Sequence, residues 1–118
     1  MKRSNSSRPQ KVGDLIHRTV AEMLLREVKD PRLSKVTITE VEVSGDLAYA
    51  KIYFSVLGDE KIILEAQNGF EKCKGFLRHG VAKACDLRVV PELIFQHDPT
   101  LAHAEEINAL IARALKPR

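Results

Sequence analysis

The chain has 118 residues, of which 44% are hydrophobic and 30% charged, and its formal net charge is +3. This length suits one domain with one core, and the composition excludes an intrinsically disordered chain. No apolar run approaches the roughly 20 residues that cross a bilayer, so we expect no membrane protein. The first ten residues are polar and basic with no apolar region behind them, so we expect no secretory signal.

Basic residues are concentrated in two segments. Residues 1–13 contain four basic and no acidic residues, and residues 72–88 contain five basic residues and one acidic residue. The rest of the chain therefore carries a net negative charge. Binding to a polyanion requires this kind of segregation, although a basic helix face is more often only solvated surface.

The first expected element is a helix from about Lys11 to Val28. Apolar residues recur there at spacings of three and four, which is typical of an amphipathic helix. Pro9 suits the first turn, where no backbone donor is needed. Asp30-Pro31 ends the helix, because the residue before a proline is pushed out of the helical region.

Two strands follow, joined by a tight turn at Ser44-Gly45-Asp46. The strand expected over Val36–Val43 changes its apolar phase near Thr39-Glu40, which indicates a β-bulge or a twisted strand covered on both faces. The strand expected over Leu47–Val56 alternates cleanly between two faces. Its predicted core residues are Ala48, Ala50, Ile52, Phe54 and Val56. Its opposite face carries Tyr49, Lys51, Tyr53 and Ser55.

A second helical pattern begins near Glu60. Its apolar stripe consists of Ile63, Ala66, Phe70, Cys73, Leu77, Val81 and Ala84. Glycines at positions 69, 75 and 80 accompany this stripe, and each costs about 1 kcal/mol relative to alanine inside a helix. We therefore expect two helices that pack on the same sheet, with a kink between them at Gly75.

A third strand is expected over Leu87–Gln96. The residues on its core face should be Leu87, Val89, Leu93 and Phe95. Pro91 cannot donate a hydrogen bond to a neighbouring strand, so this strand should lie at an edge or be interrupted there. Asp98-Pro99 suits a helix start, and a last helix should follow to about Leu115.

The sequence offers few convergent groups for catalysis or metal binding. It contains no His-Glu-x-x-His pair, no Gly-x-x-x-x-Gly-Lys-Ser/Thr loop and no Gly-x-Ser-x-Gly elbow. Cys73 and Cys85 form no Cys-x-x-Cys pair, so we expect two reduced thiols in a cytoplasmic protein. His97-Asp98 fits an incidental pair ahead of a helix cap. We expect no active site, no cofactor and no metal.

Several short segments, taken in order, carry a family resemblance. They are Lys29-Asp30-Pro31-Arg32-Leu33, Val36-Thr37-Ile38-Thr39, Val43-Ser44-Gly45-Asp46-Leu47, Ala50-Lys51-Ile52-Tyr53, Gly75-Phe76-Leu77-Arg78, the run from Leu87 to Phe95, and Asp98. The expected element order resembles a type II KH domain, an α+β fold with a three-stranded sheet and helices on one face. KH domains clamp RNA with a Gly-x-x-Gly loop, which this chain lacks. Over residues 8–113 the sequence resembles the bacterial ribosome-binding factor A family.

This resemblance implies a single KH-like RNA-binding domain over residues 1–118, with a flexible basic arm at 1–8 and a C-terminal helix at 99–115. It implies a cytoplasmic, non-enzymatic monomer that binds the small ribosomal subunit and helps its ribosomal RNA to be processed and folded. Other assembly factors are further candidate partners, and a role in cold adaptation is expected. The family has an Ala-x-Gly kink where this chain has Cys73-Lys74-Gly75.

Eight basic side chains are the candidates for RNA contact. They are Arg3, Arg8, Lys11, Arg18, Lys74, Arg78, Lys83 and Arg88. Lys74 and Arg78 would lie at the kink, where the helix dipole and the side-chain charge both favour phosphate. For each position, exposed surface without an RNA contact is an equal alternative.

Two other functions remain open. The chain could be a protein-interaction adaptor that uses the Tyr49/Tyr53 sheet face or the last helix, with the basic patch incidental. Tyrosines interleaved with lysine could also stack RNA bases, although two half-buried tyrosines are the simpler interpretation. A very small hydrolase around His97 and Asp98 would need catalytic partners that the sequence lacks.

Overall fold

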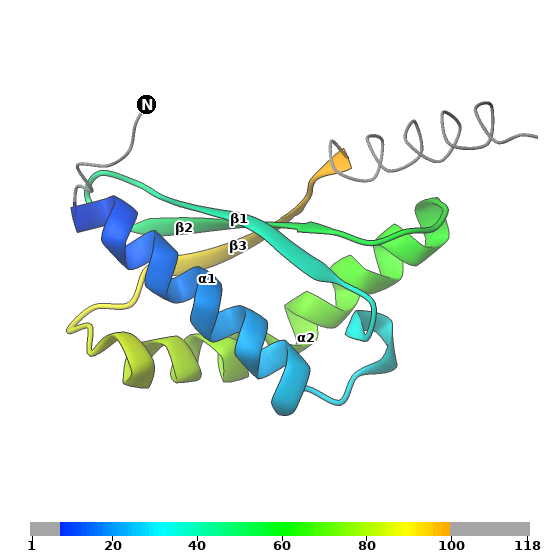
Figure 1. Ribbon diagram of the computed structural model, residues 1–118, viewed down its shortest axis with the longest axis horizontal. Coiled ribbons are helices and arrows are strands. Elements are labelled where there is room, and N and C mark those ends of the chain that lie inside the picture. Colours follow the sequence, from blue (N-terminus) through cyan, green and yellow to red (C-terminus); the bar gives the residue numbers. More distant parts are fainter. Residues whose placement is uncertain (1–7, 100–118) are drawn as a thin grey trace, which may run out of the picture.

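The structure, a computed structural model, describes residues 8–99. Its elements, in chain order, are α1 (Arg8–Arg26), the short 3-10 helix η1 (Pro31–Leu33), β1 (Thr37–Val43), β2 (Tyr49–Ser55), α2 (Glu60–Cys85) and β3 (Glu92–His97) (Figure 1). The predicted basic arm and C-terminal helix lie outside the described residues, except at Arg8 and Pro99. Among the described residues, no helix combines the length and apolar character needed to span a membrane.

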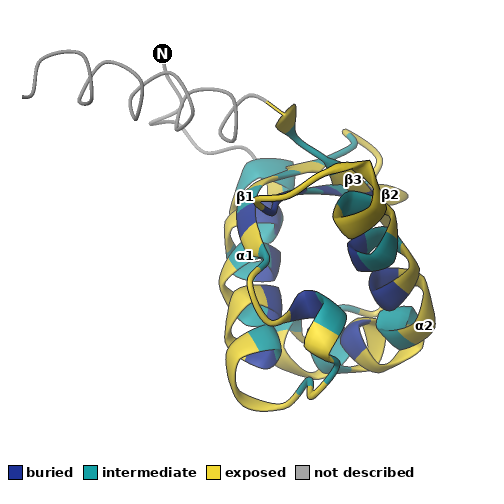
Figure 2. Cartoon of the chain, turned by 90° about the vertical axis from the view of Figure 1, so that its right-hand side faces the viewer, coloured by how far each residue is buried: buried dark blue, intermediate teal, exposed yellow. Residues whose placement is uncertain are grey.

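The three strands form one sheet in the order β1-β2-β3, so β1 and β3 are its edges. β1 runs antiparallel to β2, and β3 runs parallel to β2. Figure 2 shows the sheet on one side of the molecule and both helices on the other, with buried residues facing the space between them. The predicted α+β fold, with a three-stranded sheet and helices on one face, is confirmed.

β1 contains the predicted bulge. Ile38 pairs with Phe54 and Glu40 pairs with Tyr53, so Thr39 is an extra residue in the ladder. The bulge restores the apolar phase, since Ile38 is buried and Val41 and Val43 then pack against the same core.

The core lies between the helices and the inner face of the sheet. At its centre, aromatic rings connect α2 to β2 and β3. The ring of Phe70 stacks on Phe95 at 4.4 Å between centroids and lies tilted against Phe54 at 4.8 Å. The other fully buried large side chains are Ile16, Val20, Ile52, Leu77, Val81, Pro91 and Leu93. The predicted core face of β2 is correct at Ala50, Ile52, Phe54 and Val56, but Ala48 is exposed because it precedes the strand.

Of the predicted helix–kink–helix, the division into two helices at Gly75 is wrong. α2 is one continuous helix of 26 residues, and Gly75 has no left-handed backbone conformation. Figure 1 shows that the axis of α2 nevertheless bends midway along its length. Both halves bury residues of the same stripe, including Phe70 and Leu77, so packing on the sheet offsets the low helix propensity of glycine.

Replacing Gly75 by alanine should raise the free energy of unfolding by about 1 kcal/mol, because alanine is the better helix former. A Cβ added at Gly75 would meet no atom within 4 Å. The contrasting change is Gly58→Ala, which should cost about 1–3 kcal/mol. Gly58 has a φ of +149°, and its added Cβ would lie 2.7 Å from Ile62 Cδ1. Urea unfolding measures both; a destabilised Gly75→Ala variant would contradict this interpretation.

The third strand is shorter than predicted. It begins at Glu92, whose N–H donates to the Ala48 carbonyl oxygen at 2.9 Å, and not at Leu87. Residues 87–91 instead connect α2 to the sheet after Asp86, which caps the helix in the left-handed conformation. Val89 is exposed in this connection, while Leu93 and Phe95 are buried as predicted. Pro91 lacks the donor that would extend the ladder, so its predicted effect on the strand is confirmed.

Asp30 organises the turn between α1 and β1. Its carboxylate accepts hydrogen bonds from the Arg32 backbone N–H at 2.9 Å and from Arg32 Nη2 at 2.7 Å. The side-chain hydrogen bond from Arg32, followed by the backbone one, lowers the pKa of Asp30 from 3.8 to about 2. The ionised carboxylate therefore stabilises this turn.

An Asp30→Asn variant keeps a capping oxygen but loses the carboxylate charge, and it should lose about 1 kcal/mol of stability at pH 7 because the hydrogen bonds from Arg32 are no longer charge-assisted. Because folding lowers the pKa of Asp30, its contribution is complete above about pH 4 and disappears as the pH falls towards 2. The stability gap between wild type and variant should therefore close over that range. Urea unfolding at a series of pH values measures the gap; a gap of constant size down to the acid limit would contradict the assignment.

Candidate nucleic-acid interface

Two arginines lie beside the second half of α2. Arg78 and Arg88 line a depression of about 510 Å³, together with Gly75, His79, Ala82, Val89 and Val90. Arg78 Nη2 donates to the Val90 carbonyl oxygen at 3.2 Å, which holds the guanidinium over the segment that follows α2. Arginine has five N–H donors, so this bond leaves others for a ligand. Gly75 has no side chain and open space beside it, which allows close approach of a phosphate backbone.

A second depression of about 550 Å³ lies between α1 and α2. Its lining includes Arg26 and Lys83, the acidic residues Glu22 and Glu27, and the ring of Phe76. Phe76 is 48% exposed, although it is a large aromatic residue. His79 lines both depressions and therefore connects them. We call Gly75, Phe76, Arg78, His79, Lys83 and Arg88 together the α2 basic surface.

The prediction that a helix dipole at Gly75 helps to bind phosphate is wrong. A helix attracts anions at its N-terminus, where N–H groups have no partner within the helix. Because α2 continues through Gly75, its N-terminus lies at Glu60, and the α2 basic surface is nearer its C-terminal end. There the dipole favours cations, and Lys83 in the last turn offsets it. Any attraction for phosphate at this surface must come from side chains.

Lys74 and Cys73 are less available than predicted. Lys74 Nζ lies 3.4 Å from Glu71 Oε1 and its side chain is half-buried, so part of its charge is neutralised. Cys73 is half-buried too, and burial, followed by the charge of Asp30, raises the pKa of its thiol. A thiol with a raised pKa is less reactive, because the thiolate is the form that oxidises.

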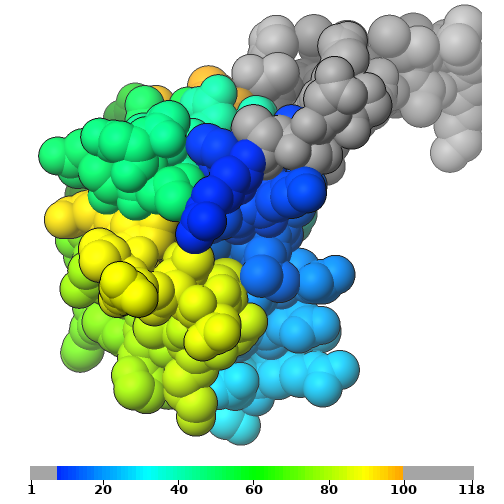
Figure 3. All heavy atoms as spheres, turned by 90° about the vertical axis from the view of Figure 1, so that its left-hand side faces the viewer, coloured from blue at the N-terminus to red at the C-terminus, as the bar shows by residue number. Residues whose placement is uncertain are grey.

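The predicted residues of α1 lie apart from the two depressions. Arg8, Lys11 and Arg18 are all exposed on the helix. Figure 3 shows the first turns of α1 and the segment after α2 at the same end of the molecule. Arg8 and Lys11 could therefore extend the positive surface around Arg88. Arg3 lies outside the described residues.

Sequence reasoning missed Phe76, His79 and Arg26. All three lie outside the apolar stripes of their helices, so the periodicity of the sequence predicts only that they are exposed. The available signal was Phe76 itself, because it follows Phe70 by six residues and so falls outside the stripe that Phe70 and Leu77 share. A large aromatic residue on the polar side of a basic helix suggests base stacking.

The outer face of the sheet has the opposite charge. Glu40 and Glu42 on β1 pair with Tyr53 and Lys51 on β2, and Glu92 on β3 pairs with Tyr49. Lys51 is thus one cation among three carboxylates, and its Nζ lies 5.9 Å from the centre of the Tyr53 ring. This acidity disfavours RNA binding by the two tyrosines.

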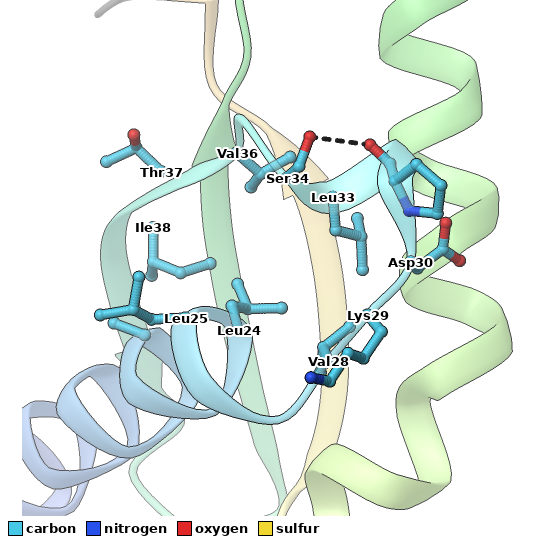
Figure 4. Close-up of a pocket in the computed structure, with 12 residues that line it drawn as sticks. Leu24, Leu25, Val28, Lys29, Asp30, Leu33, Ser34, Val36, Thr37 and Ile38 are labelled. Atoms are coloured by element: carbon cyan, nitrogen blue, oxygen red, sulfur yellow. Dashed lines mark hydrogen bonds between the residues drawn. The ribbon is translucent and has the colours of Figure 1, made fainter.

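The remaining candidates offer no catalytic arrangement. The ring of His97 packs against Phe54 at 5.6 Å, whereas Asp98 Oδ2 accepts a hydrogen bond from Thr39 Oγ1 at 3.1 Å. Among residues 8–99, no group of three or more His, Cys, Asp or Glu side chains is placed to hold a metal ion. A further groove, between the end of α1 and the start of β1, has a volume of about 500 Å³ and is lined mainly by aliphatic residues. Leu24, Leu25 and Val36 are among those labelled in Figure 4.

Comparison with known proteins finds one family. The ribosome-binding factor A family profile matches residues 8–111. Ribosome-binding factor A of Thioalkalivibrio sulfidiphilus is 45% identical over 109 residues, which cover 92% of this chain and 84% of the relative. The solution structure of a Thermotoga maritima protein, described as a candidate ribosome binding factor A, has a TM-score of 0.68 and 34% identity and covers 77% of this chain and 87% of that one.

A more distant structure shows the same fold. It is a homology model of Thermus thermophilus ribosome binding factor A, fitted into the cryo-EM map of a complex with the 30S subunit. The TM-score is 0.60 at 24% identity, with 72% of this chain and 89% of that chain covered. With the family match over nearly all of its length, this chain belongs to the ribosome-binding factor A family.

Proposed function

We propose that this chain binds the small ribosomal subunit through the α2 basic surface and assists the folding and processing of its ribosomal RNA without catalysing a reaction. The observation that carries the proposal is the convergence of Arg78 and Arg88 beside Gly75, next to an exposed Phe76. Membership of a family whose members are named for ribosome binding supports it. The Thermus thermophilus relative, which was fitted into a 30S complex, supports the choice of subunit.

The chemistry of this surface suits folded RNA with accessible bases. Arginine side chains bind phosphate oxygens through paired N–H groups, and these contacts position the protein without reading sequence. An unstacked base could lie on the ring of Phe76. A protein that binds one RNA conformation more tightly than another increases the population of the first, so binding alone is sufficient to assist maturation.

The cellular setting belongs to the same proposal. We expect the protein to act as a monomer in the cytoplasm, where ribosomal subunits are assembled, and other assembly factors to bind beside it. A role at low temperature would follow, because RNA duplexes dissociate more slowly in the cold and misfolded RNA then persists longer.

Sedimentation of a cell lysate through a sucrose gradient tests the proposal. The protein should travel with free small subunits and be depleted from the fractions of large subunits and complete ribosomes. Cells without the protein should accumulate the unprocessed precursor of the small-subunit RNA. A protein that remains at the top of the gradient in low salt, with normal processing in its absence, would exclude the proposed function.

A further inference from the structure

The outer face of the sheet is not covered by any element of the described chain. Both helices pack on the inner face, and the side chains that alternate with Ala50, Ile52 and Phe54 point to the other side (Figure 2). The strand registers place three apolar or aromatic groups on this outer face, namely Tyr49, Tyr53 and Ile94. Tyr49 is 54% exposed, and Ile94 is also exposed. Exposed aromatic and aliphatic groups gathered on one face are a candidate contact surface.

Acidic residues surround this strip. Glu40 pairs with Tyr53, Glu42 with Lys51, and Glu92 with Tyr49, so carboxylates occur along both edge strands. The Tyr53 hydroxyl donates to Glu42 Oε1 at 3.1 Å. A partner for this face should therefore combine an apolar stripe with positive charge.

The chain leaves β3 on this side of the sheet. Asp98 follows His97, whose ring packs against Phe54 on the inner side, so the carboxylate of Asp98 lies on the outer side. There Asp98 Oδ2 accepts from Thr39 Oγ1, and the Asp98 N–H donates to the Phe54 carbonyl oxygen at 2.7 Å. These two bonds hold Asp98, shortly before residue 100, at one end of the outer face.

The sequence of residues 100–118 matches that face. Its apolar residues recur at spacings of three and four, as in an amphipathic helix, at Leu101, Ala104, Ile107, Leu110, Ile111 and Ala114. Its basic residues, Arg113, Lys116 and Arg118, are gathered at the far end. A helix over residues 100–115 would be about 24 Å long. The six residues of β3 span about 20 Å, so the basic end would reach the row of Glu92 and Glu42.

We infer that residues 100–118 fold back over the outer face of the sheet, with their apolar stripe on Tyr53 and Ile94 and their basic end beside Glu92 and Glu42. The segment then completes a second hydrophobic layer of the domain. This inference is independent of the proposed function, because the α2 basic surface belongs to the opposite side of the sheet.

Tyrosine fluorescence tests the inference in the intact chain. The protein has two tyrosines and no tryptophan, and both tyrosines lie on the outer face, so the emission reports on that face alone. Ile107→Asp with Leu110→Asp should release the segment and raise the acrylamide quenching constant about twofold, because covered rings become accessible. The matched control is Ala109→Asp, which changes the opposite side of the same segment and should leave quenching unchanged.

Two outcomes of the quenching experiment would overturn the inference. Equal quenching constants for the wild type, the double variant and the control would overturn it. Protection of the tyrosines that disappears on dilution would also overturn it, because a second copy would then be the occupant.

A disulfide test locates the segment. In a chain with Cys73→Ala and Cys85→Ala, the pair Ile94→Cys and Ile107→Cys should form an intramolecular disulfide at least about tenfold faster than the pair Ile94→Cys and Ala109→Cys, since residue 109 faces away. Equal rates, or bridges between two chains, would contradict the inference. Sedimentation with small subunits tests the proposed function separately, so failure of one leaves the other intact.

Discussion

Replacing Phe70 by alanine should lower the free energy of unfolding by about 3–5 kcal/mol, the usual cost of removing a buried phenyl ring. Phe70 is fully buried, and its ring contacts both Phe95 on β3 and Phe54 on β2. It therefore joins α2 to two strands at once, and the surrounding rings cannot collapse into the space without moving the sheet. Small domains are stable by about 5–15 kcal/mol, so this one change should remove a large share of the stability.

Phe76→Ala is the matched control, because it removes the same ring from the same helix. Phe76 is 48% exposed, so the change should alter stability by no more than about 0.5 kcal/mol. Its effect should fall on binding, where loss of base stacking costs about 1–3 kcal/mol. Urea unfolding and binding to purified small subunits separate the two roles. Equal losses of stability in both variants would show that the assignment of Phe76 to the surface is wrong.

Reversing two charges of the α2 basic surface should have the largest effect on binding. Arg78→Glu with Arg88→Glu should weaken affinity for the small subunit about a hundredfold or more, since each lost charge-assisted hydrogen bond contributes about 1.5 kcal/mol. Both side chains are exposed, and the hydrogen bond from Arg78 to Val90 is a surface contact. The folded state should therefore lose at most about 1 kcal/mol. Filter binding or fluorescence anisotropy with labelled protein measures the affinity.

The control for charge reversal is Lys35→Glu with Lys61→Glu. Both lysines are exposed, and they lie before β1 and in the first turn of α2, away from the two depressions. The net charge changes by the same amount as in the test variant. If the affinity falls equally in both double variants, the protein is attracted by its total charge, and the α2 basic surface has no special part.

The sequence predicted the strands better than the helices. The alternation in β2 and the phase change at Thr39 are local sequence patterns. The pairing of β1 with β2 agrees with both patterns, because burial of one face of the sheet fixes the register. The expected break at Gly75 failed for a different reason. Helix propensity is a weak local preference, and the packing of Phe70 and Leu77 on one sheet keeps α2 continuous across the glycine.

The site was only partly predictable. Arg78, Lys83 and Arg88 were found because basic residues are visible in the sequence, but their neighbours depend on how two helices and a connection meet. Arg26 joins Lys83 only through the packing of α1 on α2, and Val90 receives a hydrogen bond from Arg78 only because residues 87–91 leave the sheet. The availability of Lys74 for RNA contact was overestimated, since its ion pair with Glu71 depends on the side-chain geometry of the helix surface.

The dependence of binding on salt tests the role of the α2 basic surface most directly. The dissociation constant for purified small subunits should be measured over a series of salt concentrations, for the wild type and for Arg78→Ala with Arg88→Ala. Each phosphate contact adds about 0.7–0.9 to the slope of log K against log salt, so loss of two contacts should flatten the line by about 1.4–1.8. Parallel lines for the two proteins, at whatever affinity, would contradict contact between these arginines and ribosomal RNA.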